Sequence, residues 1–177
     1  MHSCVTGLEH AAILIIGVST MDAYSMTYEV RWTDIDANRH VRYSAYIDAA
    51  AELRYRFFTQ HNLPPEAFDN LGIGPVYTSL TANFFREVRL GETLTITYLL
   101  TGLSPQGIRW KVQHDFLKTN GKKAVTVSLE GTILNLTTRQ PTMPTPEIMA
   151  VFQQVPCSSD FEVLSESRWF KKLVVST

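Results

Sequence analysis

The sequence has few cysteines, almost no net charge and no long apolar run, and each shortage excludes a class of protein. Its two cysteines, Cys4 and Cys157, lie near opposite ends without the spacing of metal ligands, so we expect no bound metal. A formal net charge of -1 gives no basic field that would attract nucleic acid. An anionic ligand must therefore be bound by a local site.

The first part of the chain carries an apolar run over residues 11–18. A membrane-spanning helix needs about 20 apolar residues, so this run predicts no membrane partner. No Lys or Arg precedes Arg31, whereas a secretory signal has a positively charged leader, so we expect a cytoplasmic protein. Met21 and Met26 are both credible alternative translation starts. The sequence does not decide whether residues 1–20 belong to the native protein, and we treat them as an N-terminal extension.

The rest of the chain has the composition of one globular domain, with 45% hydrophobic residues in a total of 177. We place that domain at residues 21–153 and a C-terminal tail at residues 154–177. Residues 26–32 alternate with a period of two and predict a strand. Residues 44–60 repeat apolar side chains every three or four positions, which predicts an amphipathic helix with Ser44 as its N-cap.

Four further runs after this helix have the pattern of strands. The first covers residues 76–88, and the others begin near Thr93, Arg109 and Lys123. Asn120-Gly121 is a strong hairpin signal, so the last two strands should pair antiparallel. One helix buries its apolar stripe by lying across such a sheet, which gives an α+β fold. A single helix leaves sheet surface for a second subunit to cover, so we expect a homo-oligomer.

The turn between the first strand and the helix is the most informative segment. It holds Asp34 and Asp36 just before the start of the helix. A helix N-terminus offers unpaired N–H groups and a partial positive charge, which polarise a carbonyl oxygen. A carboxylate beside it could act as a base or nucleophile, so the segment is a candidate site for thioester cleavage.

The same residues resemble a known family. Trp32 precedes the Asp34-Ile35-Asp36 triplet, His40-Val41 follows, and the helix holds Tyr46, Glu52 and Arg54. In this order they resemble the hotdog-fold acyl-CoA thioesterases of the 4-hydroxybenzoyl-CoA thioesterase-like family, over about residues 26–153. Arg39 stands where many relatives have Gly, and Arg42-Tyr43 replaces a frequent Asn-Asn pair.

The resemblance implies a hotdog fold, in which an antiparallel five-stranded sheet wraps around one long central helix. It implies a homodimer or homotetramer with active sites between subunits. It also matches Asp36 to the catalytic carboxylate and the backbone N–H of Tyr43 to the donor for the thioester oxygen. Asp34 is then a structural turn residue.

Each of the remaining candidate residues could have either a structural role or a functional one. His40 either contacts substrate or Asp36, or simply holds the turn together. Glu52 fits an exposed ladder of helix charges, and His114 fits a buried core position. Substrate-binding candidates are Trp32, Asn38, Tyr46, Arg86 and Arg89. Four aromatic residues either line an acyl pocket or belong to the core: Phe84, Phe85, Trp110 and Phe116.

The function predicted from these residues is hydrolysis of an acyl-CoA thioester to a free acid and coenzyme A. It needs no cofactor, since coenzyme A is part of the substrate. Two alternatives stay open: hydrolysis of acyl groups on acyl carrier protein, and a non-catalytic hotdog module that binds acyl-CoA.

Overall fold

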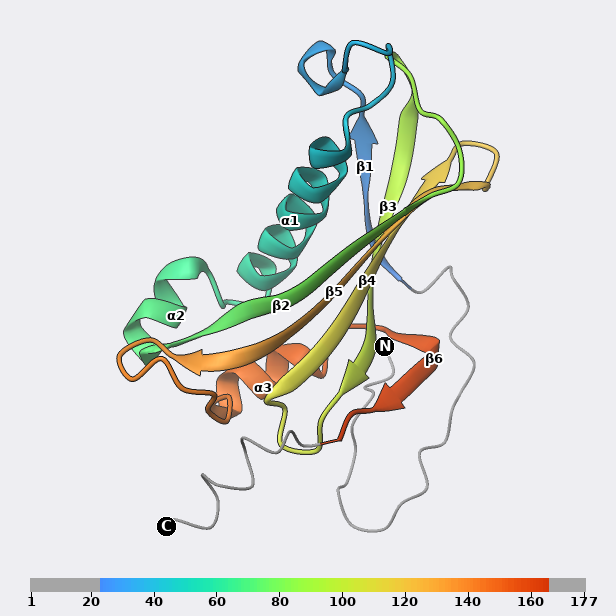
Figure 1. Cartoon of the computed structure of the whole chain (residues 1–177). Coiled ribbons are helices and arrows are strands. Elements are labelled where there is room, and N and C mark those ends of the chain that lie inside the picture. Colours follow the sequence, from blue (N-terminus) through green and yellow to red (C-terminus); the bar gives the residue numbers. More distant parts are fainter. Residues whose placement is uncertain (1–22, 166–177) are drawn as a thin grey trace.

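The computed structural model describes residues 23–165, which form one sheet with helices against it (Figure 1). The strands are β1 (Tyr24–Glu29), β2 (Ile73–Phe84), β3 (Thr93–Leu103), β4 (Arg109–Lys118), β5 (Lys123–Asn135) and β6 (Cys157–Val163). The helices are α1 (Tyr43–Gln60), α2 (Pro65–Leu71) and α3 (Pro146–Phe152), with a short 3-10 helix, η2 (Trp32–Asp34). Among the described residues, no helix has the length and apolar character to cross a membrane.

The sheet confirms the predicted α+β class but has six strands, not five. Five strands lie in the order β1-β3-β4-β5-β2 with antiparallel neighbours, and β6 pairs in parallel with β3. β1 pairs with β3 as far as Tyr98, and β6 takes over at Leu100. β6 falls within residues 154–177, the segment set apart in the sequence as a C-terminal tail, for which no strand was predicted.

The predicted hairpin between β4 and β5 is confirmed. Gly121 has a φ of 76°, a left-handed conformation that glycine adopts without steric cost. The Lys118 N–H donates to the Lys122 carbonyl at 2.9 Å and closes the turn. Along β4, buried and partly buried residues alternate, as expected for a strand that packs one face on the core.

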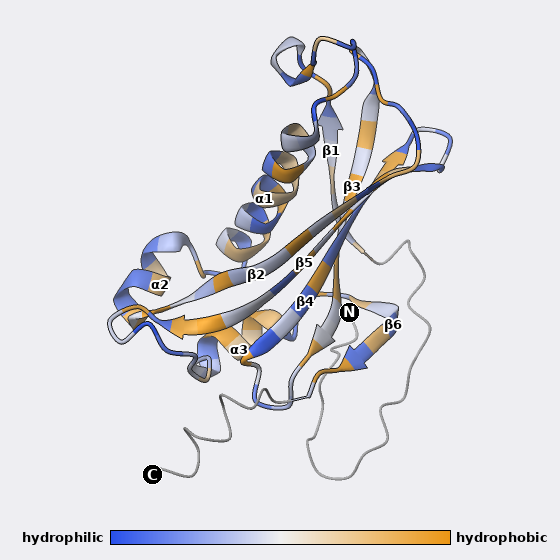
Figure 2. Ribbon diagram, viewed as in Figure 1, coloured by the Kyte–Doolittle hydropathy of each residue, from blue (hydrophilic) through white to orange (hydrophobic). Residues whose placement is uncertain are grey.

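Helix α1 lies against one face of the sheet, and its ribbon alternates between hydrophobic and hydrophilic segments (Figure 2). Phe57 packs edge-on against Tyr98 of β3, with 5.3 Å between ring centroids. The predicted N-cap is wrong, because the helix begins at Tyr43 with Arg42 at the N-cap position, and Ser44 lies inside the first turn. Glu52 pairs with Arg56 at 2.7 Å on the exposed side, which confirms the charge ladder there.

Strand β2 forms one edge of the sheet and crosses its partners diagonally (Figure 1). It begins and ends three to four residues before the predicted range of 76–88. From Tyr77 to Phe84 every residue except Ala82 is exposed. The first strand is also shorter than predicted, since it ends at Glu29 and places Trp32 in η2.

Candidate active site

The turn between β1 and α1 is closed by its own backbone. The Asp36 N–H donates to the His40 carbonyl at 2.9 Å, and the Arg39 N–H donates to the Asp36 carbonyl at 3.0 Å. Arg39 has a φ of 64°, the left-handed region that glycine enters most easily. The position where many relatives have Gly therefore keeps its left-handed backbone here with an arginine.

Asp34 is the structural aspartate of this turn, as predicted. Its side chain is fully buried, and its Oδ2 accepts hydrogen bonds from the Tyr28 hydroxyl at 2.7 Å and the Arg31 N–H at 3.0 Å. The Arg31 guanidinium contacts both carboxylate oxygens at 3.2 Å. Burial raises the pKa of Asp34, but the bonds from Arg31 and Tyr28 together outweigh it and hold the pKa below its ordinary value.

Asp36, two residues later, has an exposed side chain. Its Oδ1 accepts the Asn38 N–H at 2.8 Å and the His40 N–H at 3.2 Å. Within residues 23–165, no hydrogen bond to Oδ2 is formed. One oxygen therefore fixes the carboxylate to the turn, and the other is left for a ligand or water.

The start of α1 supplies N–H groups to the same region. The Arg42 N–H donates to the Asp34 carbonyl at 2.8 Å, but the Tyr43 N–H donates to nothing in the described part of the chain. The ring of Tyr43 is 70% exposed, so its contribution to a site would come from its backbone. The Arg42 side chain spans the helix start, with contacts to Ser44 Oγ and to Asp48 at 3.4 Å.

A cavity of about 320 Å³ opens beside the turn. It is lined by His40, Val41, Tyr46, Phe84, Phe85, Arg86, Glu87 and Val88. Tyr46 is nearly fully buried, and its ring meets the ring of Phe84 edge-on at 5.9 Å. Burial, with a smaller effect of Glu92, raises the pKa of Tyr46 to about 12, so its hydroxyl keeps its proton at neutral pH.

Some of the predicted site residues meet at this cavity and others do not. His40, Tyr46 and Arg86 line it, and His40 Nε2 lies 3.3 Å from Glu87 Oε2. Asn38 contacts Asp36 through its backbone. The lining does not include Asp36 or Tyr43. Trp32, 77% exposed, and Arg89 also lie outside it, and Arg89 pairs with Glu87 at 3.2 Å.

The aromatic candidates divide in the same way. Phe84 and Phe85 are each 55% exposed and line the cavity, whereas Trp110 and Phe116 are buried. Sequence reasoning missed Val41, Glu87 and Val88 in the lining. The Val41 N–H donates to the Val88 carbonyl at 2.9 Å, a contact between distant segments that no local pattern reveals. Over residues 23–165, no three His, Cys, Asp or Glu side chains gather into a candidate metal site.

Comparisons with known proteins bear on the fold and on the family. Among solved structures, the chain is similar to the Staphylococcus aureus protein SAV2348 in complex with CoA, with 18% identity, a TM-score of 0.69, and 84% of this chain and 91% of that chain covered. It is similar to Slr0204, a 1,4-dihydroxy-2-naphthoyl-CoA thioesterase from Synechocystis, with 11% identity, a TM-score of 0.67, and coverage of 75% and 96%. It is also similar to the probable thioesterase YbaW from Escherichia coli, with 19% identity, a TM-score of 0.65, and coverage of 75% and 98%.

These likenesses establish the hotdog fold. No curated protein sequence matches the chain. A family model of the thioesterase-like superfamily matches residues 30–152, which contain the turn, α1 and the sheet from β2 to β5. The prediction of a thioester hydrolase is thereby confirmed at the level of the family, and the chain belongs to the thioesterase-like superfamily.

Proposed function

We propose that this protein hydrolyses an acyl-CoA thioester to a free acid and coenzyme A, with Asp36 as general base or nucleophile. The observation that carries the proposal is the Asp36 carboxylate, held through Oδ1 with Oδ2 unbonded within residues 23–165, in a turn that precedes a helix N-terminus and whose His40 lines a cavity of about 320 Å³. The similar structure of SAV2348 is a complex with CoA, which supports coenzyme A as the carrier.

In this proposal the thioester carbonyl oxygen accepts the Tyr43 N–H, which carries no other bond within the described chain. That donor stabilises the negative charge of the tetrahedral intermediate, an effect worth roughly 10²- to 10³-fold in rate. As a base, Asp36 takes a proton from water while the water oxygen attacks the carbonyl carbon. The carbon–sulfur bond then breaks, and the proton passes to the leaving thiolate.

As a nucleophile, Asp36 would instead attack the carbonyl carbon, and the carbon–sulfur bond would break to release the coenzyme A thiolate and leave a mixed anhydride. Water would hydrolyse that anhydride and regenerate the carboxylate. The free Oδ2 serves either route, and the proposal includes both.

We also propose that the active unit is a homodimer or homotetramer, with β2 at a subunit interface. β2 presents one unpaired edge, and its exposed side chains include Tyr77, Leu80 and Phe84. An exposed apolar edge strand is a template for pairing with another chain. Phe84 also lines the cavity beside Asp36, so a second subunit on β2 would border the site.

The test measures release of free thiol from a panel of aliphatic and aromatic acyl-CoAs by the wild type and by Asp36→Asn. We expect the substitution to lower kcat by roughly 10²- to 10⁴-fold, the usual contribution of a positioned general base. The matched control is Asp69→Asn, which makes the same change at an exposed position of α2.

Equal activity of the wild type and Asp36→Asn would reject the proposed site. If no acyl-CoA is cleaved by the wild type but several bind, the non-catalytic binding module replaces the enzyme. Light scattering of the wild type and of Leu80→Lys tests the β2 interface, and a Leu80→Lys protein of unchanged mass would exclude it.

A further inference from the structure

Helix α1 carries a buried arginine, Arg54, about two turns beyond Tyr46. Arg54 is only 7% exposed, yet no carboxylate in residues 23–165 forms an ion pair with it. The acid nearest in sequence, Glu52, is bound to Arg56. A buried charge without a counter-charge is costly, so this guanidinium is expected to have a partner that residues 23–165 do not supply.

Neutral groups hold the guanidinium in one orientation. Its Nε donates to the Tyr77 hydroxyl at 3.2 Å, and its Nη1 lies 2.8 Å from His114 Nε2. His114 Nδ1 lies 3.0 Å from the Thr97 carbonyl, so Nδ1 carries the proton and Nε2 accepts from Arg54. Within the described residues, Nη2 has no acceptor.

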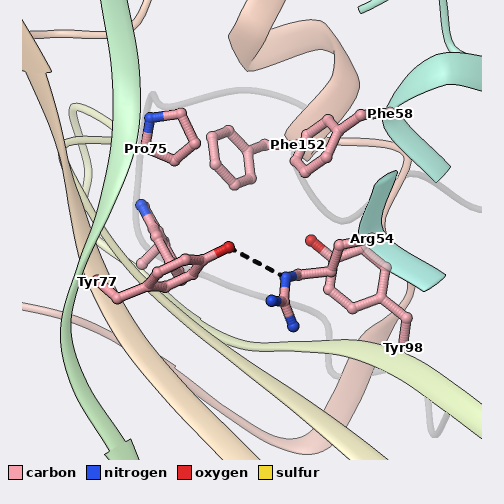
Figure 3. Close-up of a pocket in the computed structure, with 7 residues that line it drawn as sticks. Arg54, Phe58, Pro75, Tyr77, Tyr98 and Phe152 are labelled. Atoms are coloured by element: carbon pink, nitrogen blue, oxygen red, sulfur yellow. Dashed lines mark hydrogen bonds between the residues drawn. The ribbon is translucent and has the colours of Figure 1, made fainter. Parts of the chain in front are cut away.

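The cavity in front of Arg54 is small and mostly aromatic (Figure 3). It measures about 20 Å³ and is lined by Arg54, Phe58, Pro75, Tyr77, Tyr98, Trp110 and Phe152. A cavity of roughly 10–15 Å³ holds one water-sized group, so one or two polar atoms fit here. Figure 3 shows the Arg54 and Tyr77 side chains pointing toward one another, from α1 and β2.

Trp110 adds an unused donor to this cavity. Its side chain is 3% exposed, and no group in the described part of the chain bonds to its Nε1. A buried donor without an acceptor costs about 1–3 kcal/mol, which a ligand that accepts a hydrogen bond would recover.

The position of Trp110 depends on a glycine in the neighbouring strand. Trp110 pairs with Gly131, and Gly131 pairs with Tyr77 across β4, β5 and β2. A Cβ on Gly131 would lie 2.0 Å from Trp110 Cζ2, so the indole occupies the space that a side chain would fill. The indole thereby reaches the ring of Tyr77, with centroids 5.5 Å apart.

We propose that this cavity binds a carboxylate, and that the carboxylate is the far end of the acyl group of the substrate. Three of the residues that line the cavity carry donors that are free within residues 23–165: Arg54 Nη2, the Trp110 Nε1–H and the Tyr77 hydroxyl hydrogen, which donation from Arg54 leaves available. A carboxylate accepts only, and the surrounding rings suit the apolar body to which it is attached.

The assignment of the carboxylate to the acyl group rests on the proposed thioesterase function. Tyr46 borders the cavity beside Asp36 and Arg54 borders this one, and both cavities lie where α1 faces β2. Tyr43, whose N–H is the proposed donor to the thioester, and Arg54 are eleven residues apart in α1, a rise of about 16 Å. A straight acyl chain with its thioester at the start of α1 would therefore run along α1 toward Arg54.

The first experiment needs no turnover. The indole N–H signal of Trp110, assigned with Trp110→Phe, is followed by NMR during titration with acetate and with sebacate. We expect a saturable shift with both acids and none with decanol, and loss of the response in Arg54→Gln. A signal that moves with neither acid, or only with protein concentration as for a second copy, overturns the proposal.

The second experiment compares sebacoyl-CoA with decanoyl-CoA, which have equal chain length and differ in the terminal carboxylate. The wild type should prefer sebacoyl-CoA, and Arg54→Gln should lower its kcat/KM for that substrate by roughly tenfold to a hundredfold. The preference of this variant for sebacoyl-CoA over decanoyl-CoA should be lost. The matched control is Arg56→Gln, which removes an exposed arginine of the same helix.

The two experiments separate this inference from the function on which it rests. Hydrolysis of decanoyl-CoA at a rate equal to or above that of sebacoyl-CoA rejects the acyl group as the source, although the protein is a thioesterase. Binding of acetate and sebacate without hydrolysis of any thioester keeps the carboxylate site and rejects the proposed function.

Discussion

Two side chains of opposite charge differ in their exposure to water: Asp36 in the turn before α1 and Arg54 within the helix. At the N-terminal turn, the Asp36 carboxylate is exposed, and its free oxygen faces water at little cost. Three turns along the helix, the Arg54 guanidinium is buried between neutral groups. An exposed group can wait for a ligand without a penalty, whereas a buried one must be oriented and supported by its neighbours.

The same turn contains an internal reference for this contrast. Asp34 and Asp36 are two residues apart, but Asp34 is buried and bound by Tyr28 and Arg31. Its oxygens are occupied, so it stabilises the turn and has no capacity left for a substrate. The two aspartates therefore differ in exposure and in free hydrogen-bonding capacity, and this difference is the basis for proposing Asp36 and not Asp34 as the catalytic carboxylate.

Outside the two proposed sites, the largest effect on the free energy of unfolding should come from His114. Its uncharged ring accepts a hydrogen bond from Arg54 and so helps to orient the guanidinium. Burial and the nearby Arg54 charge lower its pKa from 6.5 to about 3. Between these values the unfolded chain binds a proton that the folded chain does not, so the free energy of unfolding falls as the pH is lowered. The slope is at most about 1.4 kcal/mol per pH unit.

Urea unfolding of the wild type and of His114→Gln between pH 6.5 and 4 measures this slope. Subtracting the two curves removes the carboxylates that titrate in both proteins. Parallel curves would show that His114 does not contribute, and the account of a neutral acceptor for Arg54 would then be wrong.

A smaller loss of stability is expected from Gly131→Ala, which tests only the buried cavity around Arg54 and Trp110. The new Cβ would meet Trp110 and the Val76 carbonyl, at 2.0 and 2.5 Å, so the indole must move. Such overpacking costs about 1–3 kcal/mol, measurable by urea unfolding with Trp fluorescence as a second readout. Gly74→Ala is the control, because its Cβ would meet Leu136 at an ordinary 3.4 Å. Equal stability of the two variants would contradict the tight fit of Trp110.

The smallest change in stability should come from Arg39→Gly, which tests only the exposed turn between β1 and α1. The residue has a φ of 64°, which costs an L-amino acid about 1–2 kcal/mol, and glycine returns about 0.5–1 kcal/mol of this through its larger unfolded-state entropy. We expect a net stabilisation of roughly 0.5 kcal/mol in thermal or urea unfolding, with thioesterase activity retained. Destabilisation would show that contacts of the Arg39 side chain outweigh the backbone strain.

The periodic elements were predictable because their signals are local. The alternation in β4, the Asn120-Gly121 turn and the apolar stripe of α1 each lie within a few neighbouring residues. The position of Asp36 was predicted from the resemblance, and its catalytic role stays a prediction. The core position of His114 is confirmed by its full burial.

The buried cavity could not be predicted, because it depends on register between distant segments. Trp110 reaches Tyr77 only because Gly131 stands between them in the sheet, and Arg54 joins them from the helix. β6 was missed for a similar reason, since it is defined by pairing with a part of β3 that β1 leaves free. Both the cavity and the pairing of β6 depend on how two or more distant elements align, and the sequence of one element alone does not specify that alignment.

The pairing of β6 has a consequence for assembly. On that side of β3, the outer rim of the sheet is made of β1, which runs opposite to β3, followed by β6, which runs with it. Like β3 itself, an incoming strand would have to pair antiparallel with one part of this rim and parallel with the other, and the two pairings have different hydrogen-bond patterns. The rim therefore offers an added strand no uniform ladder, whereas the opposite side of the sheet ends in the single strand β2.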